Sequence, residues 1–247
     1  MKPKLFLMNA LLCGVFFAAT LNAQEPKPGE QVDCVFKYKV GDKDAELKYD
    51  LFVPKNYTAN EKFPLMLFLH GAGERGDDLN QVRKWGPPKL VKKRNDFPFI
   101  LISPQCPKDG WWTTKADALA KLVDEVAGKL SVDKKKMYCT GLSMGGYGTW
   151  TLCAKHPNLF AAAAPVCGGG DPKSAAVLKN LPIWTFHGDA DNVVPLSGTK
   201  KMIDAIKEAG GENAKITIYK GVGHNSWSET YANEELYKWL LSHSRGE

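Results

Sequence analysis

Short apolar runs alternate with helical patterns along most of this chain of 247 residues. Six of these runs are bounded by turn residues, and they cover residues 65–69, 99–102, 137–140, 160–166, 183–186 and 216–219. Runs that are apolar on both faces are typical of parallel strands covered by helices. The alternation therefore predicts an α/β fold, in which right-handed crossovers build a mostly parallel, twisted sheet with helices on both faces.

Two further segments complete the expected sheet. Residues 46–53 alternate apolar and polar positions and end at a proline, which is typical of an antiparallel strand near a sheet edge. The preceding residues 24–46 form an N-terminal segment with a possible edge strand, so we expect about eight strands in all. Apolar residues at helical spacing predict helices over 119–130 and 232–240. We expect one α/β domain over residues 47–247.

The composition excludes several classes of protein. Hydrophobic residues make up 44% of the chain and charged residues 24%, as in an ordinary soluble globular protein. A disordered chain, a coiled coil and a multi-span membrane protein are therefore excluded. The net charge of +6 falls to +4 when Lys2 and Lys4 are set aside, which leaves 31 basic against 27 acidic residues. A charge this small, without a clustered basic face, argues against a nucleic-acid partner.

The first residues of the chain have the features of a secretory signal peptide. Lys2 and Lys4 precede an apolar stretch over residues 5–21, and a small residue, Ala23, stands before a polar break. This order predicts a signal peptide over residues 1–23 that is cleaved after Ala23. The alternative is an uncleaved membrane anchor. We expect an exported protein, periplasmic or secreted, with no stable membrane insertion after cleavage.

The cysteines left after cleavage are odd in number: Cys34, Cys106, Cys139, Cys153 and Cys167. At least one thiol is then free or paired between chains, and the chain is no disulfide scaffold. The sequence has no C-x-x-C or H-E-x-x-H spacing, so we expect no metal site and no cofactor. We also expect Cys106 and Cys167 not to be bridged, because the family that the motifs described below resemble implies a strand order that keeps them too far apart.

A candidate nucleophile follows the run at 137–140. Residues 141–145 read Gly-Leu-Ser-Met-Gly, a G-x-S-x-G pattern between an expected strand and an expected helix. In that context the turn lifts the hydroxyl of Ser143 out of the sheet, and the glycines leave room for the neighbouring backbone. A helix N-terminus beside the serine favours developing negative charge. A plain glycine-rich turn is the alternative interpretation.

A serine needs a base to act as a nucleophile near neutral pH. Of the five histidines, His224 lies in the glycine-rich loop after the last expected strand, at the edge of the sheet that carries Ser143. The chain order nucleophile, acid, histidine favours His224 as the base. His70 and His187 end strands and are compatible with packing roles, and His156 and His243 fall near helix ends.

The acid that orients the base is expected after the run at 183–186, where Asp189 and Asp191 compete. For either residue the alternative is ordinary turn chemistry. An oxyanion hole requires two aligned backbone donors. Met144, directly after the nucleophile, is expected to supply one N–H group, and Ala72, in the small-residue loop after the run at 65–69, is expected to supply the other.

The order of these motifs resembles that of the α/β-hydrolase superfamily. The closer resemblance is to its secreted esterase and "predicted peptidase" branch, which is related to polyhydroxybutyrate depolymerase-like, feruloyl esterase-like and acyl-protein-thioesterase-like enzymes. It rests on Leu-His-Gly-Ala-Gly-Glu-Arg-Gly at 69–76, Gly-Leu-Ser-Met-Gly-Gly at 141–146, His-Gly-Asp-Ala-Asp at 187–191, Val-Pro at 194–195 and Gly-His at 223–224.

The resemblance covers roughly residues 47 to 241. It also indicates which of the two aspartates is the acid that orients His224. The family pattern H-G-x-x-D-x-x-V-P places the acid on Asp191, and the two extra residues also give Asp191 the reach toward the loop of His224. The resemblance implies an α/β-hydrolase catalytic domain that cleaves carboxylic esters through a covalent acyl-enzyme, without a cofactor.

Four further side chains are candidates for substrate binding. Trp111 and Trp112 follow the run at 99–102, and they would stack on an aromatic acyl group or a sugar if both were exposed. At least one of them packing onto the core is the alternative. Glu74 would orient a substrate or form a local ion pair, and Trp227 would form a wall of the cleft. The segment after residue 166 leaves room for only a small lid or none.

These observations favour an exported serine esterase acting on small or carbohydrate-linked carboxylic esters, that is, on a small-molecule or polysaccharide-linked substrate. A serine peptidase of the prolyl-oligopeptidase-like type is the enzyme alternative, because the same triad also attacks amides. A non-catalytic binding protein on a hydrolase scaffold is the alternative from another class, although it would be expected to lack the nucleophile, the base or the acid.

Overall fold

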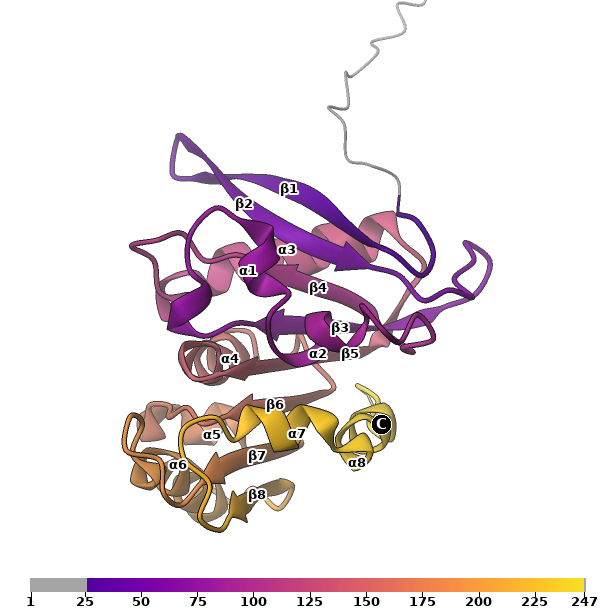
Figure 1. Cartoon of the computed structure of the whole chain (residues 1–247). Coiled ribbons are helices and arrows are strands. Elements are labelled where there is room, and N and C mark those ends of the chain that lie inside the picture. The colour runs from indigo at the N-terminus through magenta and orange to yellow at the C-terminus, as the bar shows by residue number, and fades with distance from the viewer. Residues whose placement is uncertain (1–25, 247) are drawn as a thin grey trace, which may run out of the picture.

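An eight-stranded sheet in the order β1-β2-β4-β3-β5-β6-β7-β8 runs through the centre of the molecule (Figure 1). The structure, a computed structural model, describes residues 26–246, so the predicted signal peptide over residues 1–23 lies outside the described residues. Strands β3 to β8 pair in parallel, and β2 is antiparallel to both of its neighbours. The mostly parallel sheet of about eight strands is confirmed.

From β3 onward, strands and helices alternate along the chain. The strands are β1 Gln31–Val40, β2 Lys43–Phe52, β3 Phe63–Leu69, β4 Ile100–Pro104, β5 Val132–Leu142, β6 Ala162–Val166, β7 Ile183–Gly188 and β8 Ala214–Tyr219. The helices are α1 Leu79–Val82, α2 Gly86–Leu90, α3 Ala116–Lys129, α4 Met144–Lys155, α5 Ala175–Leu178, α6 Leu196–Glu208, α7 Trp227–Ala232 and α8 Glu234–Leu241. Single turns of 3-10 helix are η1 Ala72–Glu74, η2 Trp112–Thr114 and η3 Pro172–Ser174.

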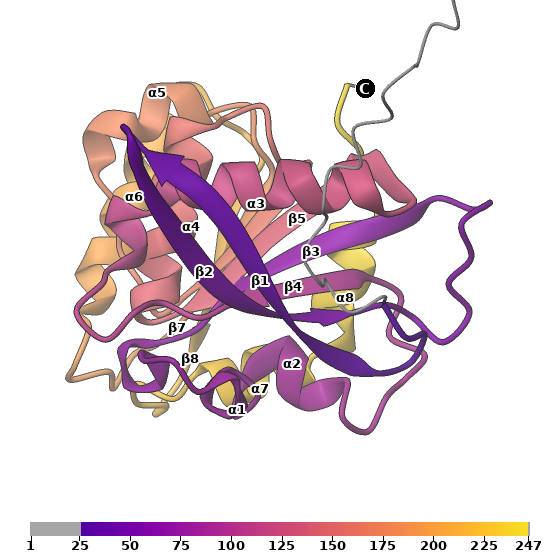
Figure 2. The ribbon, with the colours of Figure 1, turned by 90° about the horizontal axis from the view of Figure 1, so that it is seen from above.

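Two hydrophobic cores lie on opposite faces of the sheet, because successive side chains of a strand point to opposite faces. In β3, Leu65 and Leu67 belong to the core under α3 to α6, while Met66 and Phe68 belong to the core under α2, α7 and α8. Figure 2 shows these two groups of helices on the two sides of the sheet. The continuous apolar run of β3 is explained by this burial on both faces.

The C-terminal helical region differs from its prediction. One helix was expected over residues 232–240, but α7 ends at Ala232 and α8 begins at Glu234. Asn233 lies between them with an extended backbone, and its side chain accepts a hydrogen bond from the backbone N–H of Glu235. Asparagine is a good N-cap because its side chain satisfies a free N–H group of the first helical turn. The cap therefore interrupts the apolar periodicity.

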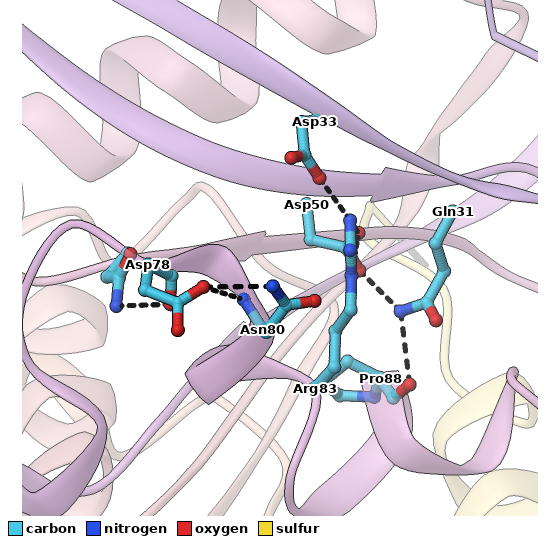
Figure 3. A network of polar contacts seen from close by, with 8 residues as sticks. Gln31, Asp33, Asp50, Asp78, Asn80, Arg83 and Pro88 are labelled. Atoms are coloured by element: carbon cyan, nitrogen blue, oxygen red, sulfur yellow. Dashed lines mark hydrogen bonds and ion pairs between the residues drawn. The ribbon is translucent and has the colours of Figure 1, made fainter.

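The N-terminal hairpin of β1 and β2 extends the sheet beyond β4. A polar network attaches it to the helices of one face (Figure 3). Asp50 of β2 is fully buried and accepts hydrogen bonds from Arg83 at 2.9 and 2.5 Å and from Gln31 at 2.5 Å. Arg83 also pairs with Asp33, and Gln31 also donates to the carbonyl oxygen of Pro88 in α2.

The parallel strands bring their carboxyl ends to one edge of the sheet, which is where ligands bind in open α/β sheets. The loops after β3, β4, β5, β7 and β8 carry the residues that the sequence predicts for the site. Between β6 and β7 the chain forms only η3 and α5, so the expectation of a small lid or none is confirmed. Within residues 26–246, no helix has the length and apolar character needed to span a membrane.

Candidate active site

Ser143 occupies the sharp turn between β5 and α4. Its φ of 52° and ψ of −115° lie in a region that residues other than glycine rarely adopt. The N–H group of Ser143 donates to the carbonyl oxygen of Val166 at 3.0 Å, and its own carbonyl oxygen accepts from Tyr147 at 3.1 Å. The strained backbone is therefore held on both sides, and the hydroxyl is placed at the N-terminus of α4.

The glycines around Ser143 are required by close backbone contacts. A Cβ atom on Gly145 would lie 1.9 Å from the carbonyl oxygen of Leu69 in β3, and one on Gly141 would lie 2.5 Å from the carbonyl oxygen of Gly145. Any side chain at either position would push the turn out of the sheet. The spacing of the G-x-S-x-G pattern thus follows from how closely α4 approaches β3.

The structure brings Ser143, His224 and Asp191 together from three different loops. The Nε2 atom of His224 is 2.9 Å from the Oγ atom of Ser143, and its Nδ1 atom is 2.7 Å from the Oδ2 atom of Asp191. The side chain of His224 is 19% exposed, whereas that of Asp191 is fully buried. This linear arrangement is that of a nucleophile, a base and an orienting acid.

The carboxylate of Asp191 is held by its own turn. Its Oδ1 atom accepts hydrogen bonds from the backbone N–H groups of Val193 and Val194, both at 2.9 Å. Burial raises the pKa of Asp191, but the hydrogen bond with His224 and these two backbone donors lower it, and the net effect is a pKa below its usual value. Asp191 is therefore ionised and fixed in orientation at neutral pH.

Asp189 has a different environment, although it lies only two residues away. It is exposed, and its Oδ1 atom accepts a hydrogen bond of 2.6 Å from the backbone N–H of Gly221. Gly221 belongs to the loop that carries His224. Asp189 thus braces that loop through its backbone and makes no contact with the imidazole among the hydrogen bonds of the described residues.

The two predicted oxyanion donors come from the loops after β5 and β3. Met144 is the first residue of α4, where backbone N–H groups have no partner inside the helix. Ala72 begins η1, and the neighbouring Gly71 lies close to Ser143, since a Cβ atom built on it would be 3.7 Å from the Cβ atom of Ser143. The loop after β3 therefore approaches Ser143, and the donor roles of Ala72 and Met144 stay predictions.

The oxyanion loop after β3 is braced by the loop after β4. His70 accepts a hydrogen bond of 2.9 Å from the backbone N–H of Cys106, and burial lowers the pKa of His70 to about 4, so its imidazole is neutral. The Nε atom of Arg75 donates to the carbonyl oxygen of Ala72 at 3.0 Å, and its guanidinium lies over the ring of Trp111 at 5.3 Å. The sequence analysis did not assign this bracing role to Arg75, because it depends on a contact between two loops.

The two adjacent tryptophans differ in position, which corrects the prediction for Trp112. Trp111 is 49% exposed, but Trp112 is fully buried. The indole N–H of Trp112 donates to the carbonyl oxygen of His70 at 2.9 Å, and its Cβ atom faces Gly148 of α4, where a side chain would lie 2.4 Å away. Trp112 is thus a packing residue that supports the oxyanion loop, and it is not exposed for stacking on a substrate.

Glu74 and Trp227 approach the site from two sides. Glu74 is 9% exposed, one of its carboxylate oxygens would be 3.1 Å from a Cβ atom on Gly71, and burial raises its pKa. Trp227 is half-buried and packs edge-on against the imidazole of His224, with ring centroids 5.3 Å apart. Trp227 also packs against Trp85 at 6.1 Å.

A possible metal ligand set coincides with this site. Among the described residues, Cys167, Asp191 and His224 form one group whose ligand atoms all lie within 4.8 Å of one another. Both ring nitrogens of His224 are engaged in hydrogen bonds, and burial raises the pKa of Cys167 to about 12, so its thiol is protonated at neutral pH. The donor set therefore suits a hydrogen-bonded triad better than a metal ion, which requires deprotonated ligands.

The five cysteines after residue 26 are all buried and unbridged. Cys106 follows β4 and Cys167 follows β6, and these strands are three positions apart in the sheet, as expected. Cys167 has a φ of 40°, and its thiol lies beside the backbone of Ser143. The sequence analysis assigned it no role, because a lone cysteine after an apolar run carries no signal of its own.

Comparison with known families agrees with this fold and site. Residues 105–235 match the model of the dienelactone hydrolase family, which is more than half of the chain. The chain therefore belongs to the dienelactone hydrolase family. The α/β-hydrolase superfamily that the sequence resemblance implied is confirmed, although the resemblance did not name this family. The matched range includes Ser143, Asp191 and His224 but not the loop of Ala72.

Named relatives are esterases. "Probable feruloyl esterase C" of Aspergillus niger is 24% identical, with 74% of this chain and 69% of that protein covered. A bifunctional acetylxylan esterase/xylanase of Neocallimastix patriciarum is 25% identical over 58% of this chain and 21% of its own length. The crystal structure of a thermostable esterase superposes with a TM-score of 0.78 at 36% identity, covering 86% of this chain and 63% of that chain.

Proposed function

We propose that this protein hydrolyses carboxylic esters through a covalent acyl-enzyme on Ser143. Membership of the dienelactone hydrolase family and relatives named as esterases support a hydrolase acting on esters. The observation that carries the mechanism is the hydrogen-bonded chain from Ser143 through His224 to Asp191, with distances of 2.9 and 2.7 Å.

In the first half of the reaction, the Oγ atom of Ser143 attacks the ester carbonyl carbon while the Nε2 atom of His224 takes the hydroxyl proton. The imidazolium that forms is stabilised by Asp191, whose lowered pKa keeps it ionised. The backbone N–H groups of Ala72 and Met144 stabilise the negative charge on the carbonyl oxygen. The C–O bond to the alcohol then breaks, and His224 returns the proton to the departing alkoxide.

In the second half, water repeats the same steps on the acyl-enzyme. His224 accepts a proton from the water as it attacks the acyl carbon. The bond from the acyl carbon to Oγ of Ser143 then breaks, His224 returns the proton to Oγ, and the carboxylic acid is released with the serine hydroxyl restored. No redox step occurs, and the protons balance over the two halves. The reaction requires no group beyond the residues of the chain and one water molecule.

The proposed substrates are small or carbohydrate-linked esters. Relatives named for feruloyl and acetylxylan ester hydrolysis support this class, and so does the short segment between β6 and β7, because a small lid leaves room for a bulky alcohol. Exposed Trp111 offers a ring on which an aromatic or sugar group can stack, and Glu74 and Trp227 contribute walls. The signal peptide predicted over residues 1–23 supports export to the periplasm or the medium.

The deciding experiment compares the wild type with Ser143→Ala on a panel of p-nitrophenyl esters with acetyl, butyryl, feruloyl and longer acyl groups. A fluorophosphonate probe should add covalently to the wild type and not to Ser143→Ala, as measured by intact mass. Ester turnover that survives in Ser143→Ala would contradict the acyl-enzyme. An activity on p-nitroanilides that exceeds the ester activity would favour the peptidase alternative, and no turnover and no labelling would favour a binding protein.

A further inference from the structure

We propose that His187 is a second histidine of the site, a positioning residue that fixes the carboxylate of Asp191 toward His224. The proposal rests on the function proposed above and adds a residue that is neither nucleophile, base nor acid. His187 is the last side chain of β7 before its terminal glycine and is fully buried. The sequence analysis considered it only as a packed residue at a strand end.

The Nε2 atom of His187 must carry a hydrogen atom. It is 2.9 Å from the carbonyl oxygen of Val194 and 3.2 Å from the Oδ2 atom of Asp191. The carbonyl oxygen can only accept, and Asp191 is ionised, so its Oδ2 atom also can only accept. The contacts therefore place the proton of His187 on Nε2, where it is donated to the carbonyl oxygen of Val194, and the carboxylate of Asp191 is a second, longer polar contact.

The other ring nitrogen anchors His187 to the far side of the site. Its Nδ1 atom is 2.8 Å from the hydroxyl oxygen of Thr199 in α6, and that hydroxyl is 3.1 Å from the carbonyl oxygen of Gly168. Because Nε2 carries the ring proton, Nδ1 is the acceptor and the hydroxyl of Thr199 donates to it. The longer approach to Gly168 is then a secondary contact, because the hydroxyl has a single proton.

Three hydrogen bonds and one further polar contact surround the carboxylate of Asp191. The backbone N–H groups of Val193 and Val194 bind Oδ1, His224 binds Oδ2, and Nε2 of His187 lies 3.2 Å from Oδ2. Without His187, the carboxylate would keep its two backbone donors but could rotate Oδ2 away from the base. The other titratable group that faces this cluster is the thiol of Cys167, which is neutral at neutral pH.

A matched pair of variants separates the two ring nitrogens of His187. The amide nitrogen of His187→Gln can occupy the place of Nε2, whereas that of His187→Asn reaches only the place of Nδ1. We expect His187→Asn to lower kcat about 10- to 100-fold with little change in KM, because the turn and the carboxylate of Asp191 both lose their contact with Nε2. We expect His187→Gln to retain most of the wild-type kcat.

The pH profile of kcat/KM supplies a readout that packing alone would not change. Removing a donor from Asp191 leaves more negative charge beside His224, so the base holds its proton more strongly. The acidic limb of the profile should therefore move to higher pH in His187→Asn and stay in place in His187→Gln. Thr199→Val, which removes only the partner of Nδ1, is the packing control and should keep the wild-type limb.

The proposal would be overturned if His187→Asn had the kcat of the wild type and the acidic limb of its pH profile did not move. An equal loss in His187→Gln, or a loss in Thr199→Val as large as that in His187→Asn, would also overturn it, because each outcome would assign the effect to packing. If His187→Asn does not fold, as judged by thermal unfolding, a loss of kcat or a shifted limb in folded His187→Gln overturns the proposal. Turnover by Ser143→Ala would instead contradict the proposed function, whatever the His187 variants do.

Discussion

The side chains of Asp191 and Asp50 are both closed to solvent, and each pairs with a basic side chain, yet their pKa values move in opposite directions. Asp191 lies in the loop after β7 and pairs with His224, and its pKa is lowered. Asp50 lies within β2 and pairs with Arg83, and its pKa is raised. The solvent exposure of the side chain alone is therefore a poor guide to the ionisation of a carboxylate.

The difference follows from the depth of burial and from the source of the donors. Asp50 is buried as a whole residue, whereas Asp191 is half-buried. Asp191 lies in the turn beyond the end of β7, and that turn supplies the backbone N–H groups of Val193 and Val194 without ordering further side chains. Asp50 is in mid-strand, where the backbone groups are used by the sheet. Its donors are the side chains of Arg83 and Gln31, and they do not outweigh the cost of burial.

The comparison separates a functional carboxylate from a structural one. Fixed donors keep Asp191 ionised, which is the state required to stabilise an imidazolium. The network of Asp50 instead joins the hairpin to α2, and α2 follows directly after Trp85, the residue that packs against Trp227 beside His224. A substitution at Asp191 should lower kcat with little effect on the stability of the fold. A substitution at Asp50 should lower stability with little effect on kcat.

The largest expected effect is that of Asp191→Asn on turnover. An asparagine keeps the shape of the side chain but does not stabilise the imidazolium and favours the wrong tautomer of His224. We expect kcat to fall about 10³- to 10⁴-fold while the protein remains folded. Steady-state kinetics on a p-nitrophenyl ester, with circular dichroism and thermal unfolding as checks, would test this. A folded variant with near-normal kcat would show that Asp191 is not the acid.

Asp50→Ala should show the opposite pattern. It leaves the guanidinium of Arg83, which is 15% exposed, without its buried partner, and breaking a buried ion pair costs about 3–5 kcal/mol of stability. Urea unfolding would measure this loss, and kcat of the folded fraction should stay close to that of the wild type. Asp33→Ala is the matched control, because Asp33 pairs with the same guanidinium but is 64% exposed, so its removal should cost about 1 kcal/mol or less.

Asp189→Asn should have a smaller effect on the same kinetic scale as Asp191→Asn. Asp189 contacts the backbone N–H of Gly221 and not the imidazole, and an asparagine oxygen can still accept that hydrogen bond. We therefore expect kcat to remain within about tenfold of the wild type. If Asp189→Asn were inactive and Asp191→Asn active, the choice between the two aspartates would be wrong.

The parts of the molecule that the sequence predicted are those marked by local patterns. Apolar runs and helical spacing gave the sheet, and the turn residues around Ser143 and His224 placed both in loops at the carboxyl edge. The meeting of Ser143, His224 and Asp191 could be expected because the parallel strands end at one edge. Their catalytic roles stay predictions until the variants above are measured.

Features set by contacts between loops could not be predicted in the same way. Nothing in the sequence distinguishes Trp111 from Trp112, and only the path of the loop over α4 buries one and exposes the other. The alternation of residues 46–53 predicted an antiparallel strand, but it did not reveal that Asp50, at one of its polar positions, is fully buried and pairs with Arg83 at the end of α1. In both cases the burial depends on a partner far away in the sequence.

The smallest expected effect concerns the dependence of stability on pH, where the two carboxylates should act with opposite signs. The pKa of Asp191 is lowered in the folded protein, so its contribution to stability is present above the ordinary value of 3.8 and is lost as the pH falls through the folded pKa. The pKa of Asp50 is raised, so the folded protein favours its protonated form, and stability falls as the pH rises from 3.8 through the folded pKa. Urea unfolding of the wild type, Asp191→Asn and Asp50→Asn between pH 3 and pH 7 would measure both contributions.

As the pH rises, the wild type should gain stability relative to Asp191→Asn and lose stability relative to Asp50→Asn. Two differences that change with the same sign would contradict the opposite environments described for the two aspartates.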